Sequence, residues 1–302
     1  MKTYDKWVLN NSNRLDDKTI IVTGATGTLG YYIAYYSLLL GAKVVLAVRN
    51  VSSGEKVKVK LQGFFPNSMI EVKYLDLNKL DTINPFVESV KQFNPYILVN
   101  NAGVYHLDNE INDQGIEKTF CTNYVGPFML SEALVPTLSK NNGKIVNQVS
   151  VTVNWYKDIN YDDFDGRNCK SKNKRYGLSK ILMTYYALSL KEAGFNADIA
   201  HPGATATTLF SSSKGGFSKA FERAIIPLMR MIFISPSKAV LSDIYAMTHD
   251  LKYGEWVGPR GAFHIFGYPK VYKLKKHLLD KGKHLEASRK TSSLINKGDI
   301  IK

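Results

Sequence analysis

The stretch Thr-Gly-Ala-Thr-Gly-Thr-Leu-Gly at residues 23–30 constrains the fold of this chain most strongly. An apolar run at 19–22 precedes it, and an apolar segment of helical length follows at 31–40. A buried strand, a glycine-rich turn and a helix start, in that order, are typical of a dinucleotide-binding unit. Glycines let the backbone approach a pyrophosphate, and free N–H groups at a helix start favour its negative charge. The predicted phosphate-binding residues are Gly24, Thr26, Gly27, Thr28, Leu29 and Gly30.

Apolar strand-like runs alternate with helix-like segments up to about residue 200. We expect strands near 19–23, 43–48, 70–75, 96–99, 144–149 and 196–200. We expect helices near 29–40, 52–62, 80–93, 114–139 and 176–193. Continuous apolar runs fit strands that are covered on both faces, and the alternation predicts an α/β fold with a doubly wound, Rossmann-like parallel sheet. The carboxyl ends of its strands share one edge, where a ligand should bind.

The alternation stops after Pro202. Residues 204–235 are rich in Ser, Gly, Ala and Thr and then become apolar and aromatic. An irregular insertion of this length in a compact domain is usually a functional lid or binding loop. With no internal repeat and no linker, we expect one domain over residues 1–302. Its cofactor part should cover about 17–203, and its substrate lid and C-terminal part about 204–302.

Composition is that of a soluble globular protein, with 44% hydrophobic and 22% charged residues. The first residues lack the apolar core of a signal peptide. Residues 31–40 are too few to span a bilayer, and 224–234 contain Pro227 and Arg230. We therefore expect a cytoplasmic protein with at most peripheral membrane contact. Cys121 and Cys169 lack metal-ligand spacing, so we expect no metal site.

The chain is basic, with a formal net charge of +14. Residues 252–302 hold 12 Lys/Arg against 4 Asp/Glu, a contribution of +8. A solvated basic surface that also attracts an anionic cofactor explains this tail, and an anionic membrane surface or another anionic partner is the alternative. The tail contains no recognisable nucleic-acid motif, so we expect no nucleic-acid partner.

The end of the second strand should meet the adenosine ribose of the cofactor. An acidic residue there binds the 2′-hydroxyl of NAD, whereas a basic residue suits the 2′-phosphate of NADP. The sequence places Arg49 there, with no acid before Glu55. Because a guanidinium matches a phosphate, the residues favour NADP(H). NAD(H) is the alternative if Arg49 is only a surface arginine.

Two short polar turns follow the next strands. They are Asp76-Leu77 and the run from Asn100 to Gly103. Turns at the carboxyl edge of a parallel sheet are where ligand contacts are expected. Taken alone, an ordinary turn explains the second one equally well. The candidate cofactor residues from these turns are Asp76, Leu77, Asn101, Ala102 and Gly103.

Tyr176 and Lys180 stand four residues apart and so share one helix face. A tyrosine that works as acid and base near neutrality needs its pKa lowered from about 10 by roughly 3, or roughly 4 kcal/mol. A neighbouring ammonium and the positive nicotinamide of an oxidised cofactor could supply this. Tyr272 and Lys276 form a second such pair in the basic tail. We favour the first pair because it starts a helix between two predicted strands and follows Ser150.

Together these motifs resemble the short-chain dehydrogenases/reductases, in their single-domain branch, and most closely the retinol-dehydrogenase-like members. An insertion between Ser150 and Tyr176 that contains Asp162-Asp163-Phe164, and the segment 235–246, also resemble that group. The resemblance covers nearly the whole chain in the following order: residues 23–30, Arg49, Asp76-Leu77, Asn100 to Gly103, Asn123, Ser150, Tyr176 with Lys180, and His201-Pro202-Gly203 followed by Thr207.

The resemblance implies an oxidoreductase that interconverts a hydroxyl and a carbonyl by hydride transfer from or to the cofactor. Tyr176 would be the acid and base, and Ser150 would stabilise the substrate oxygen. Lys180 would lower the pKa of Tyr176 and hold the nicotinamide ribose, and Asn123 would hold a water of a proton relay. Homodimers or homotetramers are common in this family.

The same resemblance implies further cofactor contacts. Asp76 would touch the adenine, and Asn101 to Gly103 would line the cofactor cleft. Pro202 and Gly203 would also border the cofactor, and Thr207 would meet the nicotinamide carboxamide.

The chain departs from the family pattern in two places. The single-domain branch usually has glycine where this chain has Thr28, and the spacing Gly24, Gly27, Gly30 matches the longer, sugar-nucleotide-modifying branch. Gln148-Val149-Ser150 replaces the usual tandem serines, and Ser150 remains the candidate because the preceding Val146-Asn147 fixes the register.

The segment 204–268 should form the substrate cleft. Its many apolar residues between Leu209 and Phe233 suit an apolar carbonyl or alcohol, such as a lipid, aromatic or retinoid-like molecule, but helix core or an oligomer contact explains them equally well. Two other functions stay open: a catalytically silent NADP-binding regulator, and a sugar-nucleotide epimerase or dehydratase suggested by the glycine spacing.

Overall fold

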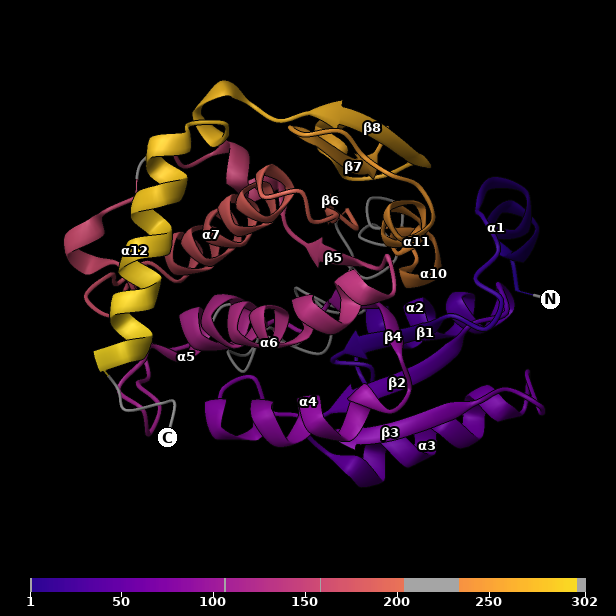
Figure 1. Ribbon diagram of the computed structural model, residues 1–302. Helices are drawn as coiled ribbons and strands as arrows, with labels where there is room; N and C mark the ends of the chain where they lie inside the picture. Colours follow the sequence, from indigo (N-terminus) through magenta and orange to yellow (C-terminus); the bar gives the residue numbers. More distant parts are fainter. Residues whose placement is uncertain (1, 106, 158, 204–233, 298–302) are drawn as a thin grey trace, which may run out of the picture.

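One sheet organises the computed structural model, which describes residues 2–105, 107–157, 159–203 and 234–297. Its strand order is β3-β2-β1-β4-β5-β6-β7-β8 (Figure 1). Neighbouring strands from β3 to β7 are parallel, and β8 is antiparallel to β7. The predicted doubly wound α/β sheet is therefore confirmed. The strands are β1 Thr19–Thr23, β2 Lys43–Val48, β3 Ile70–Tyr74, β4 Pro95–Asn100, β5 Lys144–Gln148, β6 Ala197–Ala200, β7 Glu255–Pro259 and β8 Pro269–Lys273.

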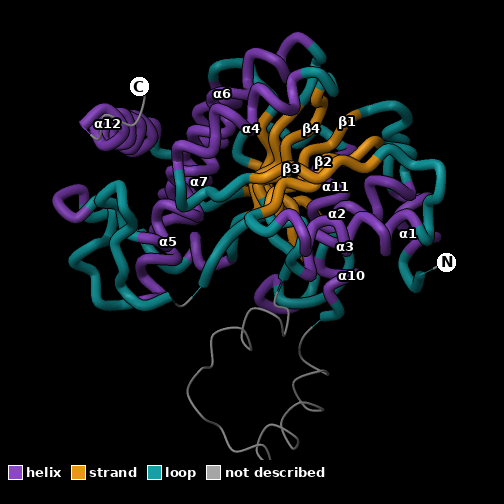
Figure 2. The backbone as a smooth tube through the Cα atoms, turned by 90° about the horizontal axis from the view of Figure 1, so that it is seen from below, coloured by secondary structure: helices purple, strands orange, loops and turns teal. Residues whose placement is uncertain are grey.

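Helices cover both faces of this sheet, as Figure 2 shows. One face carries α2 (Thr28–Leu39), α3 (Val51–Gln62) and α11 (Leu241–Thr248). The other carries α4 (Ile83–Lys91), α6 (Gly126–Lys140) and α7 (Lys172–Glu192). The remaining described helices are α1 Asp5–Asn11, α5 Lys118–Phe120, α10 Pro236–Ala239 and α12 Lys281–Lys297.

Successive residues of a strand belong to two separate hydrophobic cores, one on each face of the sheet. Ile21 and Val45 pack with the α4, α6 and α7 side. Ile20, Val22 and Val44 pack with the α2 and α11 side. Because side chains alternate along a strand, a run that is apolar at every position buries residues on both faces. This accounts for the largely apolar runs of β1, β2 and β4, and all six predicted strands coincide with observed ones to within a residue.

Two predicted helices begin elsewhere. The one expected over 114–139 starts only at Lys118, because Ile111 pairs with Glu117 in a β-bridge and the Glu117 carboxylate accepts the Phe120 N–H. A π-helical turn, Cys121–Val125, then leads into α6. The helix expected from 176 starts at Lys172, where the Ser171 hydroxyl accepts the Lys174 N–H. Tyr176 therefore lies in the second turn of α7 rather than at its start.

Two strands that the sequence did not predict follow the segment after Pro202. β7 extends the sheet, and β8 returns beside it as the edge strand. Gly258 and Pro259 interrupt the apolar pattern of β7. β8 carries exposed Lys270 and Lys273, so neither strand reads as an apolar run. The predicted lid at 204–233 lies outside the described residues.

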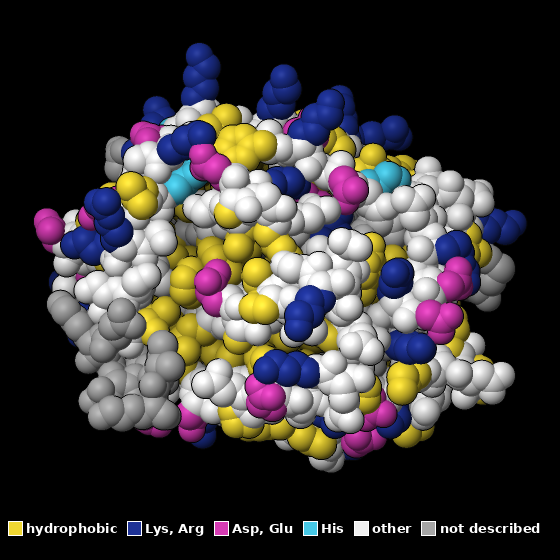
Figure 3. Space-filling view, in the orientation of Figure 1, with side chains coloured by type: hydrophobic (Ala, Val, Ile, Leu, Met, Phe, Trp, Pro, Cys, Tyr) yellow, Lys and Arg dark blue, Asp and Glu magenta, His cyan; other side chains and the backbone are white. Residues whose placement is uncertain are grey.

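The C-terminal segment folds back across the molecule from β8 to α12. There the Tyr124 and Thr291 hydroxyls lie 2.6 Å apart, and the rings of Tyr185 and His284 pack at 4.7 Å. Figure 3 shows an apolar hollow beside α12 and Lys/Arg side chains projecting along the upper edge, where β8 lies. This is consistent with the solvated basic surface expected from the charge of this region.

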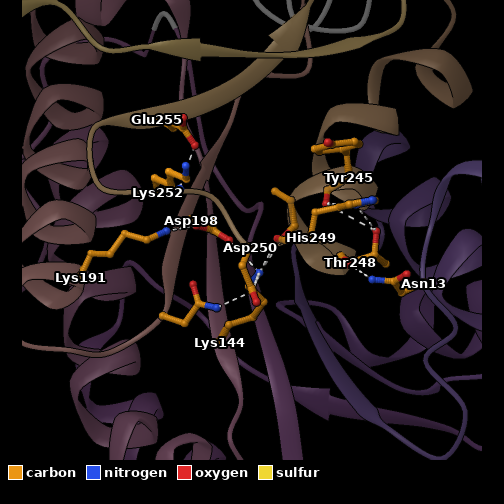
Figure 4. A network of polar contacts seen from close by, with 12 residues as sticks. Asn13, Lys144, Lys191, Asp198, Tyr245, Thr248, His249, Asp250, Lys252 and Glu255 are labelled. Atoms are coloured by element: carbon orange, nitrogen blue, oxygen red, sulfur yellow. Dashed lines mark hydrogen bonds and ion pairs between the residues drawn. The ribbon is translucent and has the colours of Figure 1, made fainter.

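A buried ion network joins β5 and β6 at their amino ends (Figure 4). The Lys144 ammonium lies 2.7 Å from Asp198 and 3.0 Å from Asp250, and the Lys191 ammonium also bonds to Asp198. The side chains of Lys144 and Asp198 are only 6% and 0% exposed. Such a pair fixes the end of the sheet opposite to the predicted ligand edge.

Replacing Lys144 by Met should lower the free energy of unfolding by roughly 3–5 kcal/mol, because Asp198 would keep a buried charge with less compensation. Urea unfolding measures the loss. The control is Lys91→Met, which removes the exposed pair between Lys91 and Glu88 and should cost less than about 1 kcal/mol. Similar losses in the two variants would contradict a structural role for the buried network.

Candidate active site

A cavity of about 300 Å³ opens at the carboxyl edge of the sheet. It lies where β1 and β4 are neighbours and the strand order reverses, which is the usual ligand position in such sheets. The structure brings the following predicted residues into its wall: Gly24, Thr26, Gly27, Thr28, Leu29, Gly30, Arg49, Leu77, Asn101, Ala102, Gly103, Tyr176 and Lys180. The wall also contains residues that were not predicted: Thr23, Ala47, Leu75, Val104, Tyr105, Thr122 and Gln148.

The glycine turn needs two of its glycines for steric reasons. Gly24 has φ +65°, a conformation that side chains disfavour. A Cβ on Gly30 would lie 2.5 Å from the Gly24 carbonyl oxygen. At Gly27 it would stay 3.2 Å away, and Thr28 begins α2 in ordinary helical geometry. The glycine spacing that departs from the family pattern therefore still forms a compact turn.

Hydrogen bonds tie this turn to the polar turn after β4. The Thr23 hydroxyl accepts the backbone N–H groups of Asn101 and Ala102, both at 3.0 Å. In return the Asn101 side-chain amide donates to the Thr23 carbonyl at 2.7 Å. Thr23 was not predicted as a site residue, although it stands at the strand end where a hydroxyl can bridge to the next strand. These bonds make the Asn-Asn-Ala-Gly run part of the cavity's framework.

The cavity wall offers groups suited to the phosphates of a dinucleotide. The N-cap residue of α2 is Gly27, which has no side chain to cap the helix, so the first N–H groups of α2 are suited to an anion. Arg49 is exposed, lines the cavity and forms no ion pair within the described residues. Gly27, Thr28 and Arg49 would hold the phosphates, and the polar turn after β4 would border the rest.

Some predicted cofactor residues lie outside the cavity wall. Asp76 accepts the Asn78 N–H at 3.0 Å, while its neighbours Leu75 and Leu77 line the cavity. Pro202 and Gly203 follow β6, where Gly203 has φ +86° and packs closely against the Ile265 carbonyl. Thr207 lies outside the described residues.

Tyr176 and Lys180 line one end of the cavity, and the other two predicted catalytic residues, Ser150 and Asn123, lie beside them outside its wall. The Ser150 side chain lies near the Tyr176 hydroxyl, where it acts to lower the pKa of that phenol. The Lys180 ammonium donates to the Gln148 carbonyl at 2.9 Å and lies 5.7 Å from the centre of the Tyr176 ring. Tyr105, which has no distinctive sequence signal, packs its ring edge-on against Tyr176 at 4.8 Å.

Asn123 joins this group from the π-helical turn. Its side chain accepts the Val104 N–H at 2.7 Å and donates to the Val104 carbonyl at 2.9 Å. A Cβ added to Gly103 would lie 3.3 Å from the Asn123 oxygen and 3.6 Å from the Lys180 ammonium. The Asn123 side chain thus braces the loop after β4, and its role in holding a water remains a prediction.

Burial controls the pKa values at this end of the cavity. It raises the pKa of Tyr176 to about 12, and the nearby Ser150 side chain offsets only part of this. It lowers the pKa of Lys180 to about 8, against the opposing charge of Asp243. The lowering of the Tyr176 pKa by Lys180 stays a prediction, as does the lowering by the positive nicotinamide of an oxidised cofactor.

Two buried ionisable groups behind the cavity were not predicted as site residues. Asp243, on α11, has a pKa raised to about 7 by burial, with its hydrogen bond to Gln148 opposing the rise. His201, after β6, has a pKa lowered to about 4 by burial and is therefore neutral at pH 7. Asp243 lies in a segment noted only for its family resemblance, where nothing marks it as buried.

Replacing Asp243 by Asn should stabilise the chain increasingly as the pH rises from 5 to 8. The carboxyl has a pKa of about 7 when folded and roughly 3.9 when unfolded, so its protonated form is favoured in the folded state. The protonated Asp243 carboxyl contributes fully to the free energy of unfolding below pH 4. This contribution, roughly 4 kcal/mol at most, is lost by about pH 7. Asparagine cannot ionise and avoids this loss.

Urea unfolding of both proteins at pH 5 and pH 8 gives the two differences to compare. Asp113→Asn, at an exposed position, is the matched control and should show a difference that does not change with pH. A constant difference for Asp243→Asn would contradict the protonated state assigned to this carboxyl.

Within the described residues, no group of His, Cys, Asp and Glu side chains is arranged to hold a metal ion. No helix of that same part of the chain has the length and apolar character needed to cross a bilayer.

Comparisons with known proteins agree with this fold and site. The family model described as short chain dehydrogenase matches residues 18–160. The chain is 32% identical over 216 residues to short-chain dehydrogenase TIC 32 B, chloroplastic, of Brassica napus, covering 66% of this chain and 68% of that protein. It is 29% identical over 208 residues to retinol dehydrogenase 14 of Mus musculus, covering 64% of this chain and 62% of that one.

Similarity in structure extends further along the chain. The crystal structure of an uncharacterised protein from Mycobacterium paratuberculosis matches with a TM-score of 0.76 at 23% identity, covering 95% of this chain and 96% of that one. This likeness supports the fold over nearly the whole length, including β7 and β8.

Proposed function

This chain belongs to the short-chain dehydrogenase family, as a retinol-dehydrogenase-like oxidoreductase, and from that premise we propose that it interconverts a hydroxyl and a carbonyl with NADP(H). The observation that carries the proposal is that Tyr176 and Lys180, with Ser150 next to Tyr176, lie at one end of a cavity whose other wall is the glycine turn. The family binds nicotinamide cofactors, and the choice of NADP(H) is part of the proposal.

In the reduction, the Tyr176 hydroxyl donates its proton to the substrate carbonyl oxygen, and in the oxidation the phenolate takes it back. Ser150 donates a hydrogen bond to the same oxygen and stabilises the negative charge that develops there. Lys180, held by the Gln148 carbonyl, provides a fixed positive charge beside the nicotinamide ribose. The bound cofactor supplies or accepts the hydride.

An apolar substrate is the class that we propose. The mouse relative is named for retinol, and the segment expected to cover the substrate is rich in apolar residues. We also propose a cytoplasmic location and a homodimer or homotetramer, as expected from the sequence and from the family resemblance.

Tyr176→Phe should lower kcat/KM for NADPH-dependent reduction of apolar aldehydes by roughly 10²–10⁴-fold, because it removes the proton donor. A panel that includes retinal, a long-chain aldehyde and an aromatic aldehyde is followed by NADPH absorbance. The matched control is Tyr272→Phe, since Tyr272 belongs to the other Tyr-x-x-x-Lys pair. Its hydroxyl lies on β8 and donates to the Pro259 carbonyl of β7. This control should leave turnover unchanged.

Turnover that survives in Tyr176→Phe would refute the mechanism. NADPH binding without turnover of any panel member by the native chain would instead favour the silent regulator. Conversion of a nucleotide sugar without net cofactor consumption would favour the epimerase alternative.

Arg49→Ala should weaken NADPH binding about tenfold or more and leave NADH binding nearly unchanged, because only NADPH carries the 2′-phosphate. Calorimetric titration of the native chain and the variant with both cofactors measures this. Arg289→Ala on α12 is the control for losing one positive charge far from the cavity. Tighter binding of NADH than of NADPH by the native chain would overturn the cofactor choice while leaving the family assignment intact.

A further inference from the structure

Gln148 links the catalytic end of the cavity, at Lys180, to the turn after β4, at Asn101. It is the last residue of β5, and its backbone carbonyl accepts the hydrogen bond from Lys180. Its side chain lines the cofactor cavity but is only 8% exposed. A buried amide in this position needs fixed partners.

The surrounding bonds determine which way this amide is turned. Asn101 donates its side-chain N–H to the Thr23 carbonyl, so its side-chain oxygen is left to accept. The Gln148 side-chain nitrogen donates to that oxygen at 3.4 Å and to a carboxyl oxygen of Asp243 at 3.2 Å. An amide nitrogen has two hydrogens, so both are used.

The side-chain oxygen of Gln148 is then the atom left without a partner among the described residues. Turning the amide over would bring its oxygen against the Asn101 side-chain oxygen, so that two acceptors would face each other, and the Asp243 carboxyl oxygen would lose the N–H that it accepts. Asp243, fully buried on α11, therefore holds the amide in one orientation from behind the cavity.

We propose that Gln148 contacts the cofactor, its side-chain oxygen accepting a hydrogen bond from the nicotinamide carboxamide N–H, and that Asp243 is the positioning residue that presents this oxygen. The proposal rests on the proposed function, since it requires NADP(H) in the cavity. The nicotinamide half is the relevant one because Gln148 adjoins Lys180 and Tyr176. The ribose hydroxyls of that half are already assigned to Lys180, which leaves the carboxamide as donor.

The test compares binding of three ligands by calorimetry: NADP⁺, its 3-acetylpyridine analogue and 2′,5′-ADP. The analogue has no carboxamide N–H, and 2′,5′-ADP has no nicotinamide half. Gln148→Leu should weaken NADP⁺ binding by roughly three- to tenfold, the range of one hydrogen bond, and should change binding of the other two ligands by less than about twofold. Gln92→Leu, at an exposed position, is the matched control and should leave all three unchanged.

Asp243 is tested by two substitutions. Asp243→Asn keeps an oxygen that accepts the Gln148 N–H, so NADP⁺ binding should stay within about twofold of the native value. Asp243→Leu removes the acceptor and should weaken NADP⁺ binding selectively, as Gln148→Leu does. If a single substitution prevents folding, the double variant Gln148→Leu/Asp243→Leu replaces both polar partners by apolar groups and should retain the fold and show the same selective loss.

The outcomes separate this inference from the proposed function. A native chain that binds none of the three ligands would refute the proposed function. Native binding with no loss of NADP⁺ affinity in Gln148→Leu would refute the contact alone. If Gln148→Leu weakens the binding of all three ligands equally, the effect is a general structural one. If it weakens NADP⁺ and its analogue equally but not 2′,5′-ADP, the contact is to a ribose hydroxyl. Either result overturns the carboxamide contact. Unchanged NADP⁺ binding in Asp243→Leu would overturn the positioning role.

Discussion

The hydrogen bonds between Thr23 and Asn101 hold the site together. They join the ends of β1 and β4, the two strands between which the chain order reverses. On one side they fix the glycine turn, and on the other they orient the Asn101 side chain toward Gln148, whose carbonyl holds Lys180. The phosphate-binding end and the catalytic end of the cavity are therefore parts of one bonded framework. A change at the strand ends is expected to move both.

The sequence predicted β1, β2 and β4 well because they are largely apolar runs that are buried on both faces. β3 differs, since it contains Glu71 and Lys73 and only its first residue is buried. The sequence predicted the last two strands poorly because β7 contains Gly258 and Pro259 and β8 is an edge strand with exposed lysines. The helix boundaries depended on capping side chains, which the hydrophobic periodicity of the sequence does not reveal. The Glu117 and Ser171 side chains set two of them, and both act through hydrogen bonds rather than through hydrophobic spacing.

The site was predictable where residue type alone carries the chemistry. The glycines, Arg49, Tyr176 and Lys180 could be assigned because their roles need particular groups at particular spacings, and the structure places all of them in the cavity wall. Gln148 and Asp243 could not be assigned in this way. They are 95 residues apart in the chain, and only the folding of α11 against β5 brings their side chains into contact. The pKa of Tyr176 also depends on burial, which the spacing of Tyr176 and Lys180 does not reveal.

The buried network around Lys144 lies at the opposite end of β5 from Gln148, and the four residue steps between them span roughly 13 Å. Substitutions this far apart usually have additive effects on stability. The chain can therefore lose stability at the catalytic edge, for example by acquiring a new substrate preference, and offset that loss by changes at the other edge without disturbing the chemistry. The separation of the two ends of one strand gives this protein room to diverge in specificity while its sheet stays intact.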